Sequence, residues 1–187
     1  MNKAAFPAPH RRRCDKKMKI LIKIIVLAIL PLAVLGGETQ SNPSFSYNLQ
    51  LAGYDYDQYD QKGALDYAEF KKVFESFDWL KEIRKIEAIK KGCSTTVSVK
   101  NDQNETELWV SAAGAAEDGS LLFLIGYIYE KDIERINPKK KRWLEIYASE
   151  GAQPVYENFE LFFSSQPTKL LNNLRKLDLY TEMEPQN

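Results

Sequence analysis

The 187-residue chain carries 26 basic and 26 acidic residues, but the two kinds are unevenly distributed. Residues 1–37 hold eight Lys and Arg against one Asp, which leaves 18 basic and 25 acidic residues, a net charge of −7, in residues 38–187. This acidic balance argues against a nucleic-acid partner, because phosphate backbones are bound by clustered Lys and Arg. Residues 38–187 are long enough for one domain with a hydrophobic core.

The N-terminal segment 1–37 is predicted to be a basic extension followed by a secretory signal peptide. A positively charged start precedes an apolar run from Ile24 to Leu35, and two small residues, Gly36 and Gly37, follow it. This order is typical of an exported protein. We expect cleavage near Gly36 or Gly37 and a periplasmic or secreted product. The alternative is an uncleaved membrane anchor, although the run is shorter than the roughly 20 residues that a spanning helix needs. Membrane contact is expected only through such an uncleaved segment.

Cleavage would also remove two residues that often act in catalysis or metal binding. It would take away the only histidine, His10, and one of the two cysteines, Cys14. Without an imidazole the usual catalytic base and a common metal ligand are missing, and Cys93 alone cannot form an internal disulfide. We therefore predict that the protein is not an enzyme and needs no cofactor. A hydrolase built on a pair of carboxylates remains as a third candidate, although no carboxylate is placed among aromatic residues in a way that would raise its pKa.

Residues 38–63 form a polar, tyrosine-rich segment ahead of a single globular domain predicted over residues 64–187. Its distinctive residues are Tyr54, Asp55, Tyr56, Asp57, Tyr59 and Asp60. Tyrosine offers a large contact area at a small entropic cost, and carboxylates attract a basic partner. We predict that these six residues contact a protein partner. The alternative is a solvated linker that joins the signal peptide to the domain.

Residues 58–70 resemble the EF-hand calcium loop. Gly63 stands at the turn position, and Asp60, Asp66 and Glu69 stand at three of the ligand positions. The resemblance implies a calcium site at these three carboxylates, and a calcium- or small-ligand-binding module is therefore the alternative function. Two further ligand positions lack a carboxylate. The same residues also fit a helix start, in which Asp66 and Glu69 form a capping box.

The rest of the chain predicts an α+β fold. Apolar residues at helical spacing indicate two helices over about residues 65–91. Four segments with alternating or continuous apolar residues then follow over about residues 93–149, and their short connections favour a four-stranded antiparallel meander. Two more helices are expected over about residues 154–179. The predicted order is therefore two helices, four strands and two helices.

Four short segments together resemble small bacterial immunity-type proteins, which neutralise effectors. They run from Phe77 to Leu80, from Leu108 to Ser111, from Leu124 to Tyr127 and from Trp143 to Tyr147. The resemblance implies a non-catalytic protein that occludes a secreted effector or toxin. Together with the acidic, tyrosine-rich segment, it makes an exported immunity or inhibitor protein the leading expectation.

Overall fold

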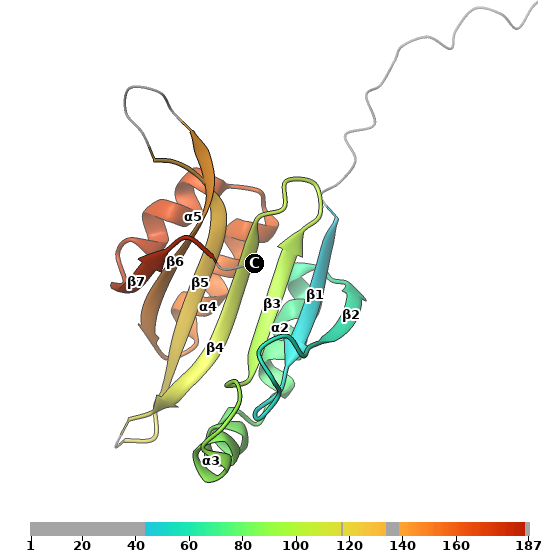
Figure 1. Cartoon of the computed structure of the whole chain (residues 1–187), viewed down its shortest axis with the longest axis vertical. Coiled ribbons are helices and arrows are strands. Elements are labelled where there is room, and N and C mark those ends of the chain that lie inside the picture. Colours follow the sequence, from blue (N-terminus) through green and yellow to red (C-terminus); the bar gives the residue numbers. More distant parts are fainter. Residues whose placement is uncertain (1–43, 117, 134–138, 186–187) are drawn as a thin grey trace, which may run out of the picture. The chain divides into compact units, whose positions relative to one another are not determined.

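The computed structural model describes residues 44–116, 118–133 and 139–185. They form a seven-stranded antiparallel sheet with the strand order β2-β1-β3-β4-β5-β6-β7, together with four helices (Figure 1). The predicted signal peptide and its cleavage site lie outside the described residues. Within the described ranges, no helix has the length and apolar character needed to cross a membrane.

The elements follow one another in a simple order. The strands are β1 (Phe45–Gln50), β2 (Asp60–Ala64), β3 (Thr96–Asn101), β4 (Glu107–Ala115), β5 (Leu121–Asp132), β6 (Lys140–Glu150) and β7 (Asp178–Met183). The helices are α2 (Tyr67–Ser76), α3 (Trp79–Ile89), α4 (Gln153–Phe163) and α5 (Pro167–Leu174). The first pair of helices thus connects β2 to β3, and the second pair connects β6 to β7.

The α+β fold class is confirmed, but the predicted arrangement of helices around a four-strand meander is wrong. The strands β3 to β6 do form a meander, with two helices before it and two after it. The sheet extends beyond it on both sides, so the helices lie between strands. The outermost strands β2 and β7 are short and largely exposed, and they depend on pairing with a neighbour more than on an apolar pattern of their own. In particular, the chain forms β7 from Asp178, where the last helix was expected to continue to residue 179.

Aromatic side chains from the helices meet the sheet on one of its faces. The ring of Phe70 in α2 stacks on that of Phe159 in α4, with centroids 3.9 Å apart. Phe74 of α2 packs against Phe123 of β5, with 5.4 Å between the ring centroids. Each fully buried side chain of this size stabilises the fold by about 2 kcal/mol. The sheet contributes alternate residues to the same core, namely Val97 and Val99, Leu108 and Val110, and Phe123 and Ile125.

The other alternation of the strands lies on the opposite face of the sheet. In Figure 1 the helices α2, α4 and α5 lie behind the sheet, and this face is turned toward the reader. On it Trp109 of β4 is paired with Gly126 of β5. A Cβ atom at residue 126 would lie 2.0 Å from the Trp109 ring, so this position requires glycine.

Candidate functional site

Residues Tyr54–Tyr59 form an ordered loop between β1 and β2, which we call the tyrosine loop. The side-chain amide of Gln50, at the end of β1, donates to the backbone carbonyl oxygens of Asp55, Tyr56 and Gln58 at 3.1, 3.3 and 3.2 Å. A backbone hydrogen bond also holds the start of the loop, because the Cys93 amide donates to the Tyr54 carbonyl oxygen at 2.9 Å. The loop backbone is therefore fixed at several points.

The side chains of the tyrosine loop point largely into solvent. Tyr56 is 89% exposed and Tyr59 is 51% exposed, so they are among the most exposed large side chains of the described residues. Asp55 and Asp57 are exposed as well, whereas Tyr54 is half-buried. The structure thus brings five of the six predicted contact residues into one loop. The sixth, Asp60, is the first residue of β2.

The three carboxylates of the EF-hand-like segment have other partners. Asp60 pairs with the Lys62 ammonium at 3.1 Å. Asp66 is the N-cap of α2 and accepts from the Glu69 amide at 2.8 Å, while the Glu69 carboxylate accepts from the Asp66 amide at 3.1 Å. This reciprocal pair confirms the capping box. Among the residues that the structure describes, no three His, Cys, Asp or Glu side chains are grouped as a metal site would require.

The most unusual polar group in the described residues is a carboxylate that sequence reasoning missed. Glu145 lies in β6 and is only 3% exposed. Its carboxylate accepts hydrogen bonds from the Tyr129 hydroxyl at 2.7 Å, from the Lys131 ammonium at 3.0 Å and from the Tyr147 hydroxyl. The Arg175 guanidinium, just after α5, lies 3.6 Å from the same carboxylate. Three hydrogen-bond donors and one more distant cation thus surround one buried anion.

These donors keep the buried carboxylate ionised. Burial alone would raise the pKa of Glu145, but the hydrogen bonds from Tyr147, Tyr129 and Lys131 outweigh it and hold the pKa below its ordinary value. The same contacts, together with burial, raise the pKa of Tyr129 and of Tyr147. A carboxylate does lie among aromatic residues, but its pKa is lowered rather than raised. It is therefore unsuited to act as a general acid near neutral pH.

The charges around Glu145 alternate in sign along a short series, which we call the charge chain. Arg175 pairs with Glu145, Glu145 pairs with Lys131, and Lys131 pairs with Glu182 of β7 at 2.8 Å. The indole N–H of Trp143 also donates to Glu182 at 3.1 Å. The chain borders a surface hollow of about 280 Å³ whose remaining lining residues are Tyr147, Leu177 and Leu179.

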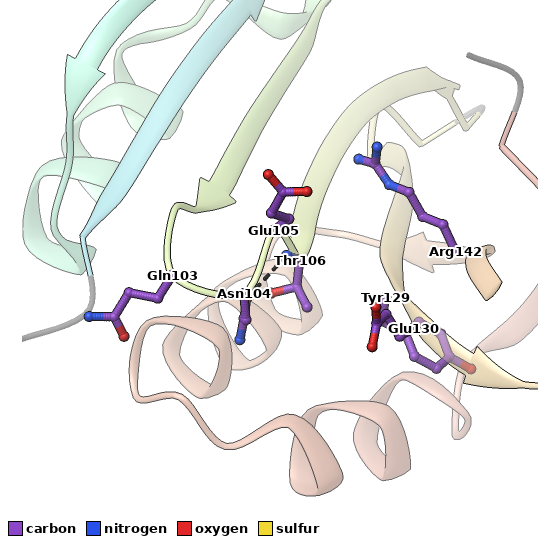
Figure 2. A pocket seen from close by; sticks show the side chains of 7 residues that line it. All are labelled: Gln103, Asn104, Glu105, Thr106, Tyr129, Glu130 and Arg142. Atoms are coloured by element: carbon purple, nitrogen blue, oxygen red, sulfur yellow. Dashed lines mark hydrogen bonds between the residues drawn. The ribbon is translucent and has the colours of Figure 1, made fainter. Parts of the chain in front are cut away.

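A second hollow lies beside this cluster, at the turn between β3 and β4. It has a volume of about 260 Å³ and is lined by Gln103, Asn104, Glu105, Thr106, Tyr129, Glu130 and Arg142 (Figure 2). Asn104 shapes the turn, because its side-chain oxygen accepts from the Thr106 amide at 3.1 Å and from the Thr106 hydroxyl at 2.7 Å. Tyr129 connects this hollow to the buried carboxylate, since it lines the hollow and its hydroxyl donates to Glu145.

The sequence contains one indication of the Glu145 cluster, by which we mean Glu145 with Tyr129, Lys131, Tyr147 and Arg175. In the segment from Trp143 to Tyr147, Glu145 shares its face of the strand with both aromatic residues, because side chains alternate between the two faces. Had the covered face been known, this alternation would have predicted a buried carboxylate. Its partners Arg175 and Glu182 follow much later in the chain, and no local spacing connects them to it.

Comparisons with known proteins give no further guidance. No family model, no curated protein and no solved structure matches this chain.

Proposed function

We propose that this chain is a non-catalytic exported binding protein that neutralises a secreted effector by occluding it. One observation carries the proposal: the tyrosine loop presents exposed aromatic and carboxylate side chains on a backbone that Gln50 holds in place. The acidic balance of residues 38–187 supports a partner with a basic surface.

The fixed conformation of the tyrosine loop favours high affinity for a partner. A flexible segment loses conformational freedom when it binds, and this loss is subtracted from the binding free energy. A loop that is already fixed avoids most of that cost, and tyrosine loses little side-chain freedom for the area that it buries. Tyr56 and Tyr59 are thus suited to be the central contacts of an interface, where a few aromatic residues commonly supply most of the binding energy.

The carboxylates of the loop contribute in a different way. Asp55 and Asp57 are exposed beside the two tyrosines. Complementary charge increases the rate of association and disfavours partners with the wrong charge, more than it increases affinity itself. An acidic loop on an acidic chain would therefore select a basic effector.

The Glu145 cluster supports a role without catalysis. Its carboxylate is surrounded by donors and its pKa is lowered, so it is neither free to accept a proton at neutral pH nor placed to donate one. The single histidine of the chain is His10, which lies outside the residues that the structure describes. Occlusion requires only a complementary surface, which the tyrosine loop offers.

Affinity capture with matched variants tests this function. Residues 41–187 would be immobilised and exposed to periplasmic and secreted fractions, together with the double variant Tyr56→Ala/Tyr59→Ala and the control Tyr180→Ala. Tyr180 is also exposed, at 67%, but it lies in β7, outside the loop. We expect one stoichiometric protein that loses its own activity when bound.

The variants show whether the tyrosine loop is responsible for binding the captured partner. The double variant should weaken binding at least about 100-fold, since a central tyrosine is worth about 2 kcal/mol or more. The control should change the affinity by less than about threefold. A partner that is held equally by the double variant, or that stays active in the complex, would refute the proposed function.

A further inference from the structure

The hollow beside the charge chain lies outside the surface used in the proposed function. Its lining comes from β5, β6, β7 and the segment after α5, and no residue of the tyrosine loop contributes to it. Its lining includes two apolar side chains, Leu177 and Leu179, and four charged ones, Lys131, Glu145, Arg175 and Glu182. Small molecules bind in concave surfaces where apolar side chains stand beside a few convergent polar groups, and this hollow combines both.

The two ends of the charge chain differ from its middle. Glu145 lies between the cations Arg175 and Lys131, and Lys131 lies between the anions Glu145 and Glu182. Each of these two middle charges is therefore balanced by charges of opposite sign within the protein. Arg175 contacts one carboxylate, at the long distance of 3.6 Å, as well as the Tyr147 hydroxyl, and its side chain is 51% exposed. Glu182, at the other end, is 46% exposed. The chain thus ends in an accessible cation on one side and an accessible anion on the other.

Stability alone gives no reason for this arrangement. Buried ion pairs are often no more stabilising than apolar side chains of similar volume, because both charges must be removed from water. Position 145 lies on the covered face, next to aromatic residues that could pack with an apolar side chain. What the buried carboxylate does provide is a fixed anchor for Lys131 and Arg175. Such an anchor holds charged groups in place before a ligand arrives.

We propose that this hollow binds a small zwitterion, an α-amino acid with an apolar side chain. The ligand carboxylate pairs with the Arg175 guanidinium, and the ligand ammonium pairs with the Glu182 carboxylate. Its apolar side chain packs against Leu177 and Leu179. Binding converts the open series of alternating charges into a closed ring, in which every charge has partners of opposite sign on both sides.

The charges of the site favour a zwitterion over a simple anion. Lys131 and Arg175 together carry two positive charges, but Glu145 and Glu182 carry two negative charges within the same group. An anion therefore gains no net attraction, whereas a molecule with both charges can meet one end of the chain with each. Inorganic phosphate is the appropriate probe for the competing anion site.

Calorimetric titration of the purified protein tests the proposal. The probes are L-valine, L-leucine and L-phenylalanine up to millimolar concentrations, with leucinamide, which lacks the carboxylate, N-acetyl-leucine, which lacks the ammonium, and inorganic phosphate. At least one of the three amino acids should bind saturably. Leucinamide and N-acetyl-leucine should each bind at least about tenfold more weakly than leucine, since each loses one charged contact.

Variants assign the binding to the two ends of the chain. Arg175→Gln and Glu182→Gln should each reduce amino-acid affinity at least about tenfold, and their melting curves would show whether they remain folded. Arg84→Gln, at an exposed arginine of α3, is the matched control and should leave the affinity unchanged. The proposal is overturned if no amino acid binds, if phosphate binds instead, or if folded Arg175→Gln binds as tightly as the original protein. None of these results bears on the tyrosine loop, so the proposed function stands or falls separately.

Discussion

The capping box of α2 and the buried Glu145 are two carboxylate arrangements with different origins and different roles. At the start of α2, Asp66 and Glu69 each accept a hydrogen bond from the backbone amide of the other, at the exposed surface and within one turn of chain. In the sheet, Glu145 is buried and is held by side chains from β5, β6 and the end of α5. The first arrangement is set by local spacing, and the second exists only after the sheet has formed.

The comparison also shows how the sheet register depends on polar groups. Glu145 is paired with Tyr127 of β5 on one side and with Glu182 of β7 on the other. Because side chains alternate between faces, a shift of one residue would move Glu145 away from Tyr129 and Lys131 of β5 and onto the opposite face. The charge chain therefore favours one register, whereas the capping box only fixes where one helix begins.

The largest effect should come from removing the buried carboxylate. Glu145→Ala would leave the Tyr129 and Tyr147 hydroxyls without their acceptor and two cations without their shared anion. We expect the free energy of unfolding to fall by about 3 kcal/mol, as measured by urea denaturation. The control Glu182→Ala removes a half-exposed carboxylate and should cost less than about 1 kcal/mol. Equal losses for the two variants would contradict the importance of burial.

Acid should weaken the original protein through the same residue. Because the pKa of Glu145 is lowered in the folded state, its contribution to stability is present above the ordinary glutamate pKa of 4.5 and is lost as the pH falls through the lowered pKa. Melting temperatures measured from pH 7 down to pH 3 should show this loss, and Glu145→Gln should reduce it. An identical acid limb in the variant would contradict the assignment.

Alkali should act through the tyrosines of the same region. Burial raises the pKa of Tyr127 to about 12, and burial beside Glu145 raises the pKa of Tyr129 and Tyr147 further. The folded state therefore favours the neutral phenols. This contribution is fully present below pH 10, the ordinary tyrosine pKa, and is lost as the pH rises above it, because the unfolded chain ionises first. Absorbance of tyrosinate during alkaline titration should rise together with unfolding.

The capping box should have a smaller effect than Glu145. Asp66→Ala removes the acceptor of the Glu69 amide at the start of α2, and we expect a loss of about 1 kcal/mol in urea denaturation. Asp57→Ala, at an exposed carboxylate of the tyrosine loop, is the control and should stay within about 0.5 kcal/mol of the original protein. A loss at Asp66 as large as that at Glu145 would show that local caps matter as much as the buried cluster.

The pattern of successful and failed sequence predictions follows from the same difference. The helices and the strands β3 to β6 have their own periodicity, and Asp66 with Glu69 has its own spacing, so each could be predicted from sequence. The edge strand β7 has exposed apolar residues such as Leu179 and no strong pattern, and it forms because β6 offers a partner. Glu145 acquires its partners only through the pairing of three strands and the position of α5. Side-chain contacts between distant segments are what the sequence could not reveal.

Calcium should have the smallest effect of all. The EF-hand-like segment uses Asp66 and Glu69 for the capping box and places Asp60 beside Lys62, so its carboxylates are already engaged. We expect millimolar calcium to leave the melting temperature unchanged. A rise in melting temperature that Glu69→Ala abolishes would instead support the calcium-binding alternative.

The central claim is that an ordered tyrosine loop binds a protein partner, and the rates of binding test it most directly. With the captured partner, association and dissociation would be measured for the original protein, Tyr56→Ala and Gln50→Ala. Gln50→Ala keeps every exposed side chain of the loop but removes the amide that holds its backbone. We expect faster dissociation for Tyr56→Ala and slower association for Gln50→Ala, because a loop that Gln50 no longer holds must be ordered on binding. Unchanged rates for both variants would contradict it.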